Sequence, residues 1–407
     1  MIEIRPVLES EFEDMRAFVN RGFGGDIRPD DAEGLAGSRA VFELDRTYCA
    51  FEDGTLVGTA ADFALEVAVP GRVVPMAGTT IVVVLPTHRR RGLLTQMMRA
   101  HVDETHDRGE PLAGLWASET VIYGRFGFGC ATDRLDFSFD ARRLGPWVDR
   151  ELDAVRMVDK ETADPLVRSF FAEWFPTRPG ALVRTDAWWT HRILRDPEQW
   201  RGGASALRFA LAERDGEVVG YCSYRQTEKF ENWEAEGSID VVDLFSMDAR
   251  ADASLWRFLA RIDLFPNVKS WNMPLDVNLA WQVGNRRAIR RSISDGLWLR
   301  LIDVAAAFAS RSAAAVGGVN VEVIDAFCPW NRGVYRIVGD DGQATATKTT
   351  QLPDLTMDVS TLGAMFLGGR DAVALMDAGL VEGDRRAAAT LSAILAADTV
   401  PWCPDVF

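Results

Sequence analysis

The chain has 407 residues, of which 47% are hydrophobic and 26% are charged, and this length predicts two or three globular domains. Its 45 lysines and arginines are outweighed by 60 aspartates and glutamates, so the formal net charge is −15. That balance argues against nucleic acid as a partner, because phosphate binding needs a basic surface, and it suits cationic small molecules or basic peptides. Acidity that serves only solubility is an equally good explanation.

Strands and helices alternate through the first third of the chain. A strand over residues 2–7 precedes an amphipathic helix over 9–20, and two further strands meet at the hairpin signal Asp53-Gly54. This order of elements predicts a mixed α/β domain. The remaining predicted elements of the region are strands over 47–52 and 55–63, a very apolar strand over 78–85, a helix from about 92 to 107, a strand over 111–117 and a short helix from Glu119.

The same order of elements returns in the middle of the chain. Strands over 207–213 and 217–225 flank another Asp-Gly turn, and a strand over 239–247 and a helix over 253–264 follow. The recurrence predicts an internal duplication. Between its strand and helix the second copy has Asp248-Ala249-Arg250-Ala251-Asp252, without a glycine. Carboxylates there would repel a pyrophosphate, so we expect this domain to bind no coenzyme.

The last hundred residues have the pattern of a small α+β domain. Strands are predicted over 319–325, 333–338 and 344–350, the last of them rich in threonine. Helices are predicted over 358–367 and 371–379, with two glycines between them.

The cysteines and histidines indicate neither a disulfide framework nor a metal site. The five cysteines are scattered and form no C-x-x-C pair, which is typical of a reducing compartment. The four histidines form no H-E-x-x-H, so no metal is expected. The amino-terminal sequence MIEIRPVLES lacks the features of a signal peptide, and no run of eighteen apolar residues occurs. We therefore expect a cytoplasmic protein with no membrane partner.

The segment from Thr79 to Met98 carries the strongest chemical signal. A buried strand ends at Pro86, a turn with three arginines and Gly92 follows, and a helix begins at once. Unpaired N–H groups and the helix dipole make a helix amino terminus a phosphate site, and arginines add charge-assisted hydrogen bonds. A basic surface turn is the alternative for such a loop taken alone, but the strand before it and the helix after it favour the phosphate site.

This loop resembles the coenzyme loop Q/R-x-x-G-x-G/A of the GCN5-related N-acetyltransferases, except that Leu94 stands at the last position. A longer set of strings, PTHRRRGLL, ASE, IYGRFGFG and the final PWCPDVF, is similar to the enhanced-intracellular-survival (Eis) acetyltransferases of actinobacteria. The resemblance covers the whole chain. It implies tandem acetyltransferase domains with mixed sheets, then a domain like sterol carrier protein 2, an acetyl-CoA co-substrate, and a homohexamer built as a trimer of dimers.

The resemblance also assigns domain boundaries and coenzyme contacts. It implies a catalytic domain over 1–145, a degenerate domain without a coenzyme site over 146–298, and a carboxyl-terminal domain over 299–407. The implied coenzyme contacts are Val82, Val83 and Val84 along the pantetheine arm, Arg90, Arg91, Gly92, Leu93, Leu94 and Thr95 around the pyrophosphate, and Ser118 and Glu119 after the next strand.

Two residues are implied to be catalytic, Tyr123 as general acid and Phe407, through its terminal carboxylate, as general base. An amine with a pKa of about 10 must lose a proton before it attacks a thioester, and an ionised carboxylate can accept that proton. A phenol can donate a proton to the departing thiolate. Ordinary aromatic packing is the alternative for Tyr123, and a frayed chain end is the alternative for Phe407.

The substrate is the least determined part of the prediction. Asp295 and Asp405 are candidates to attract a polycation, although each is equally compatible with a surface or turn aspartate. Trp188, Trp189 and Trp200 are candidates for pocket lining, with packing as the favoured alternative. The expected reaction is acetylation of primary amines on aminoglycoside- or polyamine-type substrates. Lysine peptides are the alternative acceptors. A different kind of function, lipid binding by the last domain, is a further hypothesis.

Overall fold

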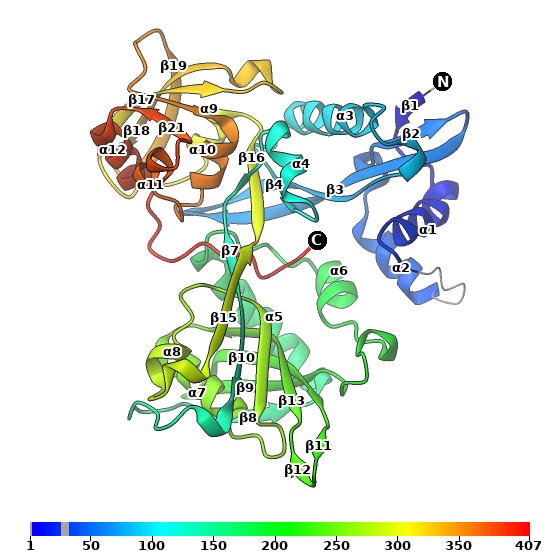
Figure 1. The fold of residues 1–407 in the computed structure, drawn as a ribbon, viewed down its shortest axis with the longest axis vertical. Helices are drawn as coiled ribbons and strands as arrows, with labels where there is room; N and C mark the ends of the chain where they lie inside the picture. Colours follow the sequence, from blue (N-terminus) through cyan, green and yellow to red (C-terminus); the bar gives the residue numbers. More distant parts are fainter. Residues whose placement is uncertain (1, 26–31) are drawn as a thin grey trace. The chain divides into compact units, whose positions relative to one another are not determined.

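The computed structural model describes residues 2–25 and 32–407. It forms two compact units, each assembled from separate stretches of the chain (Figure 1). The first unit contains Met1–Thr132, Pro179–His191 and Gly296–Phe407, and the second contains Asp133–Arg178 and Arg192–Asp295.

The first unit is built on a seven-stranded sheet of order β1-β2-β3-β4-β5-β16-β6. Its strands are β1 (Ile2–Arg5), β2 (Cys49–Glu52), β3 (Thr55–Val69), β4 (Arg72–Val84), β5 (Leu112–Trp116), β6 (Gly129–Cys130) and β16 (Leu297–Leu301). Its accompanying helices are α1 (Phe12–Gly22), α2 (Ala32–Val41), α3 (Leu93–Asp107), α4 (Thr120–Tyr123) and α6 (Asp186–Trp188).

The hairpin of β3 and β4 is longer than the sequence pattern predicts (Figure 1). The expected strand 55–63 continues to Val69, and the next strand begins at Arg72 rather than at 78. The chain reverses at Pro70-Gly71, where Gly71 has φ +82°, a left-handed conformation that glycine adopts without strain. Strand β3 is largely buried, and β4 is buried or half-buried from Met76 onward, so their apolar residues show no clear alternation in the sequence.

The second unit has a sheet of order β15-β7-β14-β13-β10-β9-β8. Its strands are β7 (Asp133–Asp140), β8 (Ala154–Val158), β9 (Arg208–Arg214), β10 (Glu217–Thr227), β13 (Ser238–Ser246), β14 (Asn267–Met273) and β15 (Arg290–Asp295), with a small ribbon of β11 (Phe230–Glu231) and β12 (Glu234–Ala235). Its helices are α5 (Lys160–Trp174), α7 (Ala249–Leu259) and α8 (Leu279–Gln282).

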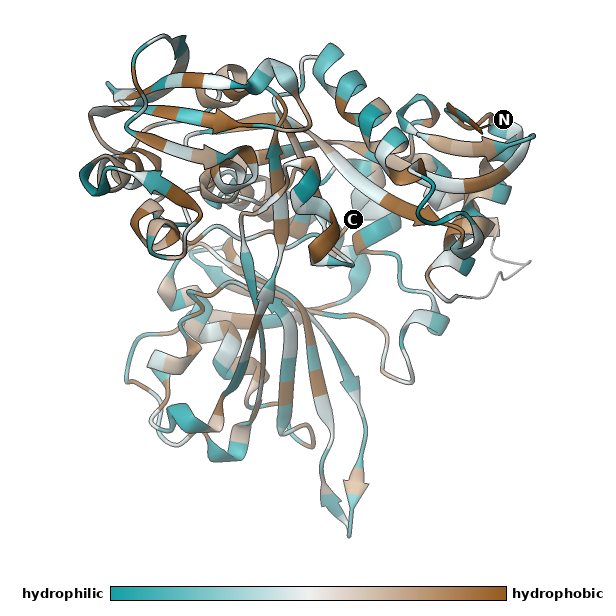
Figure 2. Ribbon diagram, turned by 45° about the horizontal axis from the view of Figure 1, so that its top comes forward, coloured by the Kyte–Doolittle hydropathy of each residue, from teal (hydrophilic) through white to brown (hydrophobic). Residues whose placement is uncertain are grey.

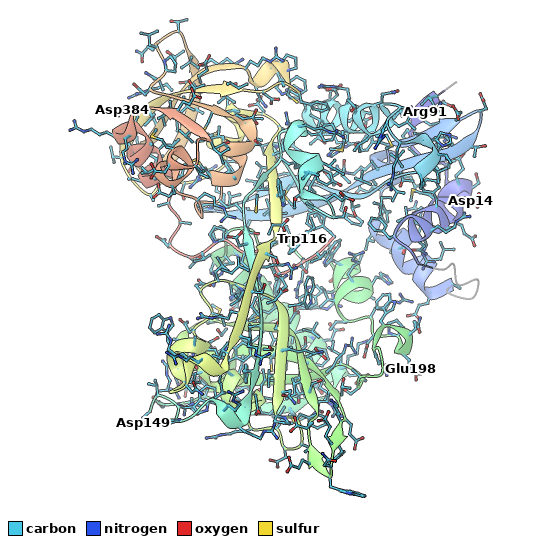
Figure 3. The ribbon with its side chains drawn as sticks, viewed as in Figure 1. Asp14, Arg91, Trp116, Asp149, Glu198 and Asp384 are labelled. Carbon is cyan, nitrogen blue, oxygen red and sulfur yellow. The ribbon has the colours of Figure 1, made fainter. Side chains whose placement is uncertain are left out.

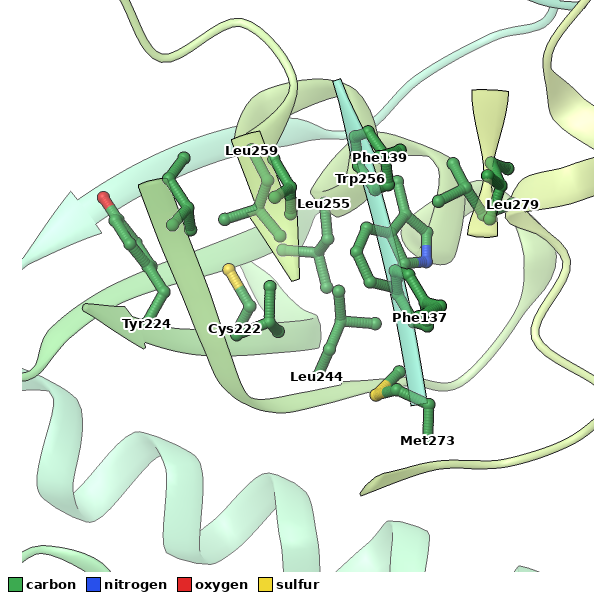
Figure 4. Packing of buried hydrophobic residues seen from close by; sticks show 14 of the residues in the cluster. Phe137, Phe139, Cys222, Tyr224, Leu244, Leu255, Trp256, Leu259, Met273 and Leu279 are labelled. Atoms are coloured by element: carbon green, nitrogen blue, oxygen red, sulfur yellow. The ribbon is translucent and has the colours of Figure 1, made fainter. Parts of the chain in front are cut away.

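Helices pack on both faces of this second sheet. On one face Trp256 of α7 is fully buried and packs edge-on against Phe137, with ring centroids 5.2 Å apart (Figure 4). On the opposite face Trp174 of α5 packs against Phe245, with centroids 4.4 Å apart. Helix α7 begins four residues earlier than predicted, because the Asp248 side chain caps it.

Each seven-stranded sheet includes a strand contributed by a distant part of the chain. Strand β16 lies between β5 and β6, and β7 lies between β14 and β15. The two sheets therefore do not divide the chain at the predicted domain boundaries of residues 145 and 298, because β7 belongs to the second sheet and β16 to the first. Periodicity identifies a strand but not its hydrogen-bonding partners, so such an exchange leaves no trace in the sequence pattern.

The carboxyl-terminal domain belongs to the first unit and has a sheet of order β19-β18-β17-β20-β21. At its centre Arg311 is fully buried, and its guanidinium donates to the carbonyl oxygens of Phe366 and Leu395, at the ends of two helices. Burial lowers the pKa of Arg311 to about 9. The elements are β17 (Gly317–Ile324), β18 (Gly333–Asp340), β19 (Gln343–Thr349), β20 (Leu355–Asp358), β21 (Val381–Gly383), α9 (Val304–Ala309), α10 (Val359–Met365), α11 (Ala372–Asp377) and α12 (Arg385–Leu395).

This architecture confirms the predicted fold class of mixed α/β sheets followed by an α+β domain. Figure 2 shows hydrophobic residues distributed along the strands of all three large sheets. Among the helices of the described residues, none combines the length and hydropathy needed to cross a bilayer.

Candidate active site

The amino terminus of α3 presents unfilled backbone donors at the predicted phosphate loop. Gly92 precedes the helix with φ +81°, and no side chain caps the first turn. Arg90 also has a left-handed backbone, with φ +63°. The first N–H groups of the helix, from Leu93 to Thr95, therefore lack the side-chain acceptor that usually satisfies them, which is the arrangement that binds phosphate oxygens.

The side chains of this loop differ in what they can contribute. Leu93 is buried among Tyr48, Val57 and Met97, so only its backbone faces the helix end. The exposed Arg91 (Figure 3) is held by the Glu52 carboxylate, which also lies 2.8 Å from Nε2 of His88. Hydrogen bonds from Arg91 and His88 lower the pKa of Glu52 to about 2. Arg91 therefore already has an anionic partner, and a phosphate would have to share it.

Strand β4 is irregular where the pantetheine contacts are predicted. A bulge places Ile81 and Val82 opposite the single residue Ala60, between the paired positions Thr59–Val83 and Ala61–Thr80. Ile81 has φ +47°, which is strained for a β-branched residue, and the Thr59 hydroxyl donates to the Ile81 carbonyl at 2.7 Å. Bulges of this kind re-aim backbone groups next to active sites.

Strands β4 and β5 separate close to this bulge. They pair in parallel only from Met76 to Gly78, and Gly78 is opposite Gly114. Beyond Gly78, no strand of the described chain pairs with the β5 side of β4, so Val82 to Val84 offer free backbone groups on that edge. An extended arm with amide groups can pair with such an edge as a peptide would. The open edge and the uncapped helix end together fit the phosphates and arm of a coenzyme A molecule.

Tyr123 closes the short helix α4 and is buried. Its side chain is 5% exposed, and its ring packs edge-on against Phe128 at a centroid distance of 6.3 Å. Burial raises the pKa of Tyr123, while a hydrogen bond with Ser118 acts in the opposite direction. The phenol therefore keeps its proton at neutral pH, as an acid must. Ser118 and Glu119 are both exposed, and Ser118 contacts the tyrosine.

The carboxyl-terminal tail reaches the point where β4 and β5 separate. Atom Cε2 of Phe407 lies 3.2 Å from the position a Cβ would occupy on Gly78. The indole Nε1 of Trp116, at the end of β5 (Figure 3), donates to the Asp405 carbonyl oxygen at 2.9 Å. The structure thus brings the last residue of the sequence to the strand opening predicted to hold the coenzyme arm.

A buried ion pair anchors this tail. Nε of Arg184 donates to the two carboxylate oxygens of Asp405 at 2.9 and 3.2 Å, and both side chains are 1% exposed. The Arg184 guanidinium also lies 4.8 Å from the ring centroid of Trp189, and the Trp402 amide donates to the Pro179 carbonyl oxygen at 2.9 Å. The segment before Arg184 extends the sheet beside β3, since the Gly180 amide donates to the Ala68 carbonyl oxygen and the Ala68 amide donates to the Ala181 carbonyl oxygen, each at 2.8 Å.

The Arg184 pair overturns the expectation for Asp405. A carboxylate that is nearly inaccessible and matched by a guanidinium does not offer its charge to a substrate, and it is not a surface aspartate. Asp295 lies half-buried at the end of β15, opposite Asp133.

The tryptophan candidates behave differently from one another. Trp188 and Trp189 are each 4% exposed and pack in the core of the first unit, in agreement with the packing alternative. Trp200 is 54% exposed, beneath the Arg195 guanidinium. No group of three His, Cys, Asp or Glu side chains within the described ranges is arranged to hold a metal ion.

Arg184 and Trp116 hold the carboxyl-terminal tail in place, and neither role was predicted from the sequence. Arg184 lies 221 positions before its partner, in a region with the composition of the middle domain, and no motif marks it. Trp116 lies within the predicted strand 111–117, directly before the ASE string, and its position at a strand end was the available signal.

Comparison with known proteins gives the same picture. Residues 3–131 and 180–301 each match a family model described as an acetyltransferase (GNAT) domain, and residues 304–404 match a sterol carrier protein domain. An uncharacterized N-acetyltransferase of Streptomyces coelicolor is 39% identical over the full length of both chains. N-acetyltransferase Eis of Mycobacterium bovis is 32% identical over 79% of this chain and 78% of its own.

Solved structures agree with these sequence relatives. The crystal structure of Eis1 from Mycobacterium abscessus has a TM-score of 0.85 and 29% identity, with all of both chains covered. A GCN5-related N-acetyltransferase from Anabaena variabilis has the same TM-score at 17% identity, which speaks to the fold alone. The resemblance drawn from the PTHRRRGLL, IYGRFGFG and PWCPDVF strings is confirmed. The chain belongs to the Eis-like, GCN5-related N-acetyltransferases.

Proposed function

We propose that this N-acetyltransferase transfers the acetyl group of acetyl-CoA to primary amines of cationic substrates, with Tyr123 as general acid and the Phe407 carboxylate as general base. The observation that carries the proposal is the contact of Phe407 with Gly78, where β4 and β5 separate. A chain end is ordinarily mobile, and here several hydrogen bonds and a buried ion pair fix it.

Acetyl-CoA, when bound, supplies an acetyl thioester. The residues proposed to hold it are the first amides of α3 with Arg90 and Gly92, and the open edge of β4 at Val82 to Val84. The left-handed Gly92 leaves the space before the helix open, since a Cβ there would meet only Gln96 Nε2, at 3.9 Å. Arg91 would contribute by sharing its charge between Glu52 and a phosphate.

The two proposed catalytic groups carry opposite tasks. A terminal carboxylate has an ordinary pKa of about 3.5, so it is ionised at neutral pH and can accept the proton that an ammonium must lose. Tyr123 has a raised pKa, so it holds the proton that a departing thiolate needs. Each such proton transfer is worth about 10²- to 10⁴-fold in rate.

The charge of the protein supports cationic acceptors over neutral ones. A net charge of −15 attracts polycations and raises their local concentration. Aminoglycosides and polyamines are the proposed class, with lysine peptides as alternative acceptors. A screen of these three groups that detects the released thiol separates them directly.

The decisive experiment extends the chain by Gly-Ser-Gly-Ser after Phe407. The new terminal carboxylate lies several ångströms away, so we expect kcat to fall at least about 100-fold while calorimetric titration finds unchanged affinity for coenzyme A. Intact-mass measurement of the parent protein first establishes that Phe407 is its last residue. Full turnover in the extended protein would refute the terminal base.

A matched control places the same four residues in the exposed turn at Asp215-Gly216, between β9 and β10, where a Cβ on Gly216 would meet no atom within 4 Å. An insertion at such a turn should leave the tail undisturbed, so we expect activity near the parent value.

Location and assembly complete the proposal. Five cysteines without a disulfide among them favour a reducing, cytoplasmic setting. The family resemblance favours a homohexamer arranged as a trimer of dimers, which light scattering of the purified protein tests.

A further inference from the structure

One face of the second sheet is only half covered by helix. On this face Tyr221 and Phe245 lie beneath α5, where Phe170 and Trp174 pack against them. The remainder of the face is hollowed into a cavity of about 620 Å³, lined by residues from β7, β10, β13, β14 and β15 and by the loop at Arg201 to Ala204. This volume is typical of sites that take small molecules.

A row of charged side chains crosses the floor of the cavity from strand to strand. Arg225 is paired with Asp240, Asp240 with Lys269, Lys269 with Ser138, and Ser138 with Arg290. Residues in register lie on the same face of a sheet, about 5 Å apart. The row therefore sets three cations at intervals along one surface.

Carboxylates behind and within the row hold its cations in place. Asp196 is 10% exposed and lies 2.6 Å from Nη1 of Arg225 and 3.3 Å from Nε of Arg201. Its second oxygen accepts the Leu207 amide at 2.7 Å, which fixes the carboxylate itself. Lys269 is held by Asp240 at 3.0 Å. Such partners orient guanidinium groups before a ligand arrives, which lowers the entropic cost of binding.

The side chains that line the cavity carry a net positive charge, which is opposite to the net charge of the whole protein. Five basic and two acidic side chains line it, although the chain as a whole has a net charge of −15. Arg290 and Arg291, at its edge, are exposed and pair with no carboxylate in the part of the chain that the structure describes. Beside them Trp271 is 52% exposed and offers an aromatic surface.

We propose that this cavity binds a small multivalent oxyanion, a compound carrying two or more phosphate or carboxylate groups. The spacing of Arg225, Lys269 and Arg290 suits several negative groups rather than one, and guanidinium forks bind either kind of oxyanion in bidentate fashion. A cationic amine substrate is the wrong sign for this site, so the cavity serves a ligand other than the acceptor.

The amino terminus of α7 is not part of this proposal. Asp248 fills that helix end with its own carboxylate, and the cavity is lined by strands and by the 201–204 loop. The proposal therefore holds or fails independently of acetyl transfer in the first unit.

The test is calorimetric titration with two probes, inorganic pyrophosphate and tricarballylate, which distinguish a phosphate ligand from a carboxylate ligand. Three proteins are compared: the parent, Arg290→Gln/Arg291→Gln, and the control Arg286→Gln/Arg287→Gln. The control removes the same charge from exposed arginines just before β15 that do not line the cavity, one of which stacks on Trp281 at 3.7 Å. Binding of a probe at the α3 helix end is common to all three proteins and cancels.

We expect at least one probe to bind the parent and the control alike, and to bind Arg290→Gln/Arg291→Gln about tenfold more weakly or with one site fewer. Higher salt should weaken the parent's binding. Equal binding by all three proteins, or no binding by the parent, would overturn the proposal. So would a change of molecular mass in solution on Arg290→Gln/Arg291→Gln with probe binding unchanged, because the face would then belong to an interface between copies.

Discussion

The amino termini of α3 and α7 occupy the same place in two related sheets and have opposite chemistry. Helix α3 begins behind a left-handed Gly92 with its first amides uncapped. Helix α7 begins behind Asp248, whose carboxylate accepts the amides of Arg250 and Ala251 at 2.9 and 3.0 Å. Arg214 binds that carboxylate at 2.8 Å, and its hydrogen bond is the main reason that the pKa of Asp248 falls to about 2.

The strands that flank these two helices are paired in the same way. In each sheet the strand before the helix carries one extra residue against its antiparallel neighbour, in β4 near Ile81 and in β13 at Val242. Before that extra residue, each strand pairs in parallel, over three positions, with the strand that follows the helix. Within this shared fold the cap residue is one of the features that decide whether a helix end can take an anion, because a helix that supplies its own carboxylate has no unfilled amides for a phosphate.

The largest expected effect comes from giving α3 the cap of α7. Gly92→Asp sets a carboxylate against the amides proposed for the pyrophosphate, so the affinity for coenzyme A should fall at least about 100-fold, or roughly 3 kcal/mol. Calorimetric titration measures it. The control Gly92→Asn has nearly the same shape, tolerates a left-handed backbone and carries no charge. Equal losses in both variants would show that geometry, rather than charge, matters at this position.

A second test concerns Asp252, in the first turn of α7. The side chain is buried, accepts hydrogen bonds from Trp256 and Gln282, and has a pKa raised by burial to about 6 from the ordinary 3.8. Between those values the folded state holds a proton that the unfolded state has released, so stability falls as pH rises from about 4 to about 6. The difference corresponds to roughly 3 kcal/mol.

Asp252→Asn should remove that pH dependence. Urea unfolding of the parent and the variant from pH 4 to pH 7.5 should show the variant gaining stability relative to the parent as pH rises. A stability difference that is constant over this range would mean that Asp252 does not titrate in it.

A third test asks whether the carboxyl-terminal tail is needed to complete the candidate active site of the first unit. Arg184→Met removes the guanidinium that is paired with the buried Asp405 carboxylate, which destabilises the tail anchor. We expect kcat to fall about 30-fold, near 2 kcal/mol, with the affinity for coenzyme A retained. The control Arg385→Met breaks an Arg–Asp pair with Asp377 that is about 60% exposed, and should change nothing measurable. Loss of coenzyme affinity in Arg184→Met would instead indicate general disruption of the first unit.

The smallest effect is expected for Asp248→Ala. Loss of the cap should cost about 1 kcal/mol, more than the same change at Asp159, which caps α5 at 2.8 Å and is paired with no arginine among the residues that the structure describes. Differential unfolding of the two variants measures the contrast. Titration should still find one coenzyme per chain, because the loop before α7 lacks the basic turn of the first copy. A second coenzyme site in Asp248→Ala would contradict that expectation.

The sequence predicted the elements that carry a local signal. The Asp-Gly hairpins, the strand–loop–helix at Gly92 and the duplicated order of elements are all short-range patterns, and the structure places them close to the expected residues. The loop at 89–92 was identified correctly as a helix start, because glycine and a preceding strand determine it locally.

What escaped prediction depends on contacts between distant residues. The pairing of Arg184 with Asp405 and the seat of Phe407 on Gly78 join positions more than 200 residues apart, and nothing local specifies them. The backbone strain at Ile81 follows from register rather than composition. The family resemblance, and not the pattern of residues, was what pointed to Phe407.

The position of β16 in the first sheet determines when that sheet can fold during synthesis of the chain. Strand β16 sits between β5 and β6, so the amino-terminal sheet cannot close until residues 297–301 have left the ribosome. Until then β5 and β6 lack their shared partner and carry open edges that invite association with other chains. A fragment that ends before β16 should therefore fold poorly and tend to associate. A recombinant acetyltransferase domain would need residues 297–301 to complete its sheet.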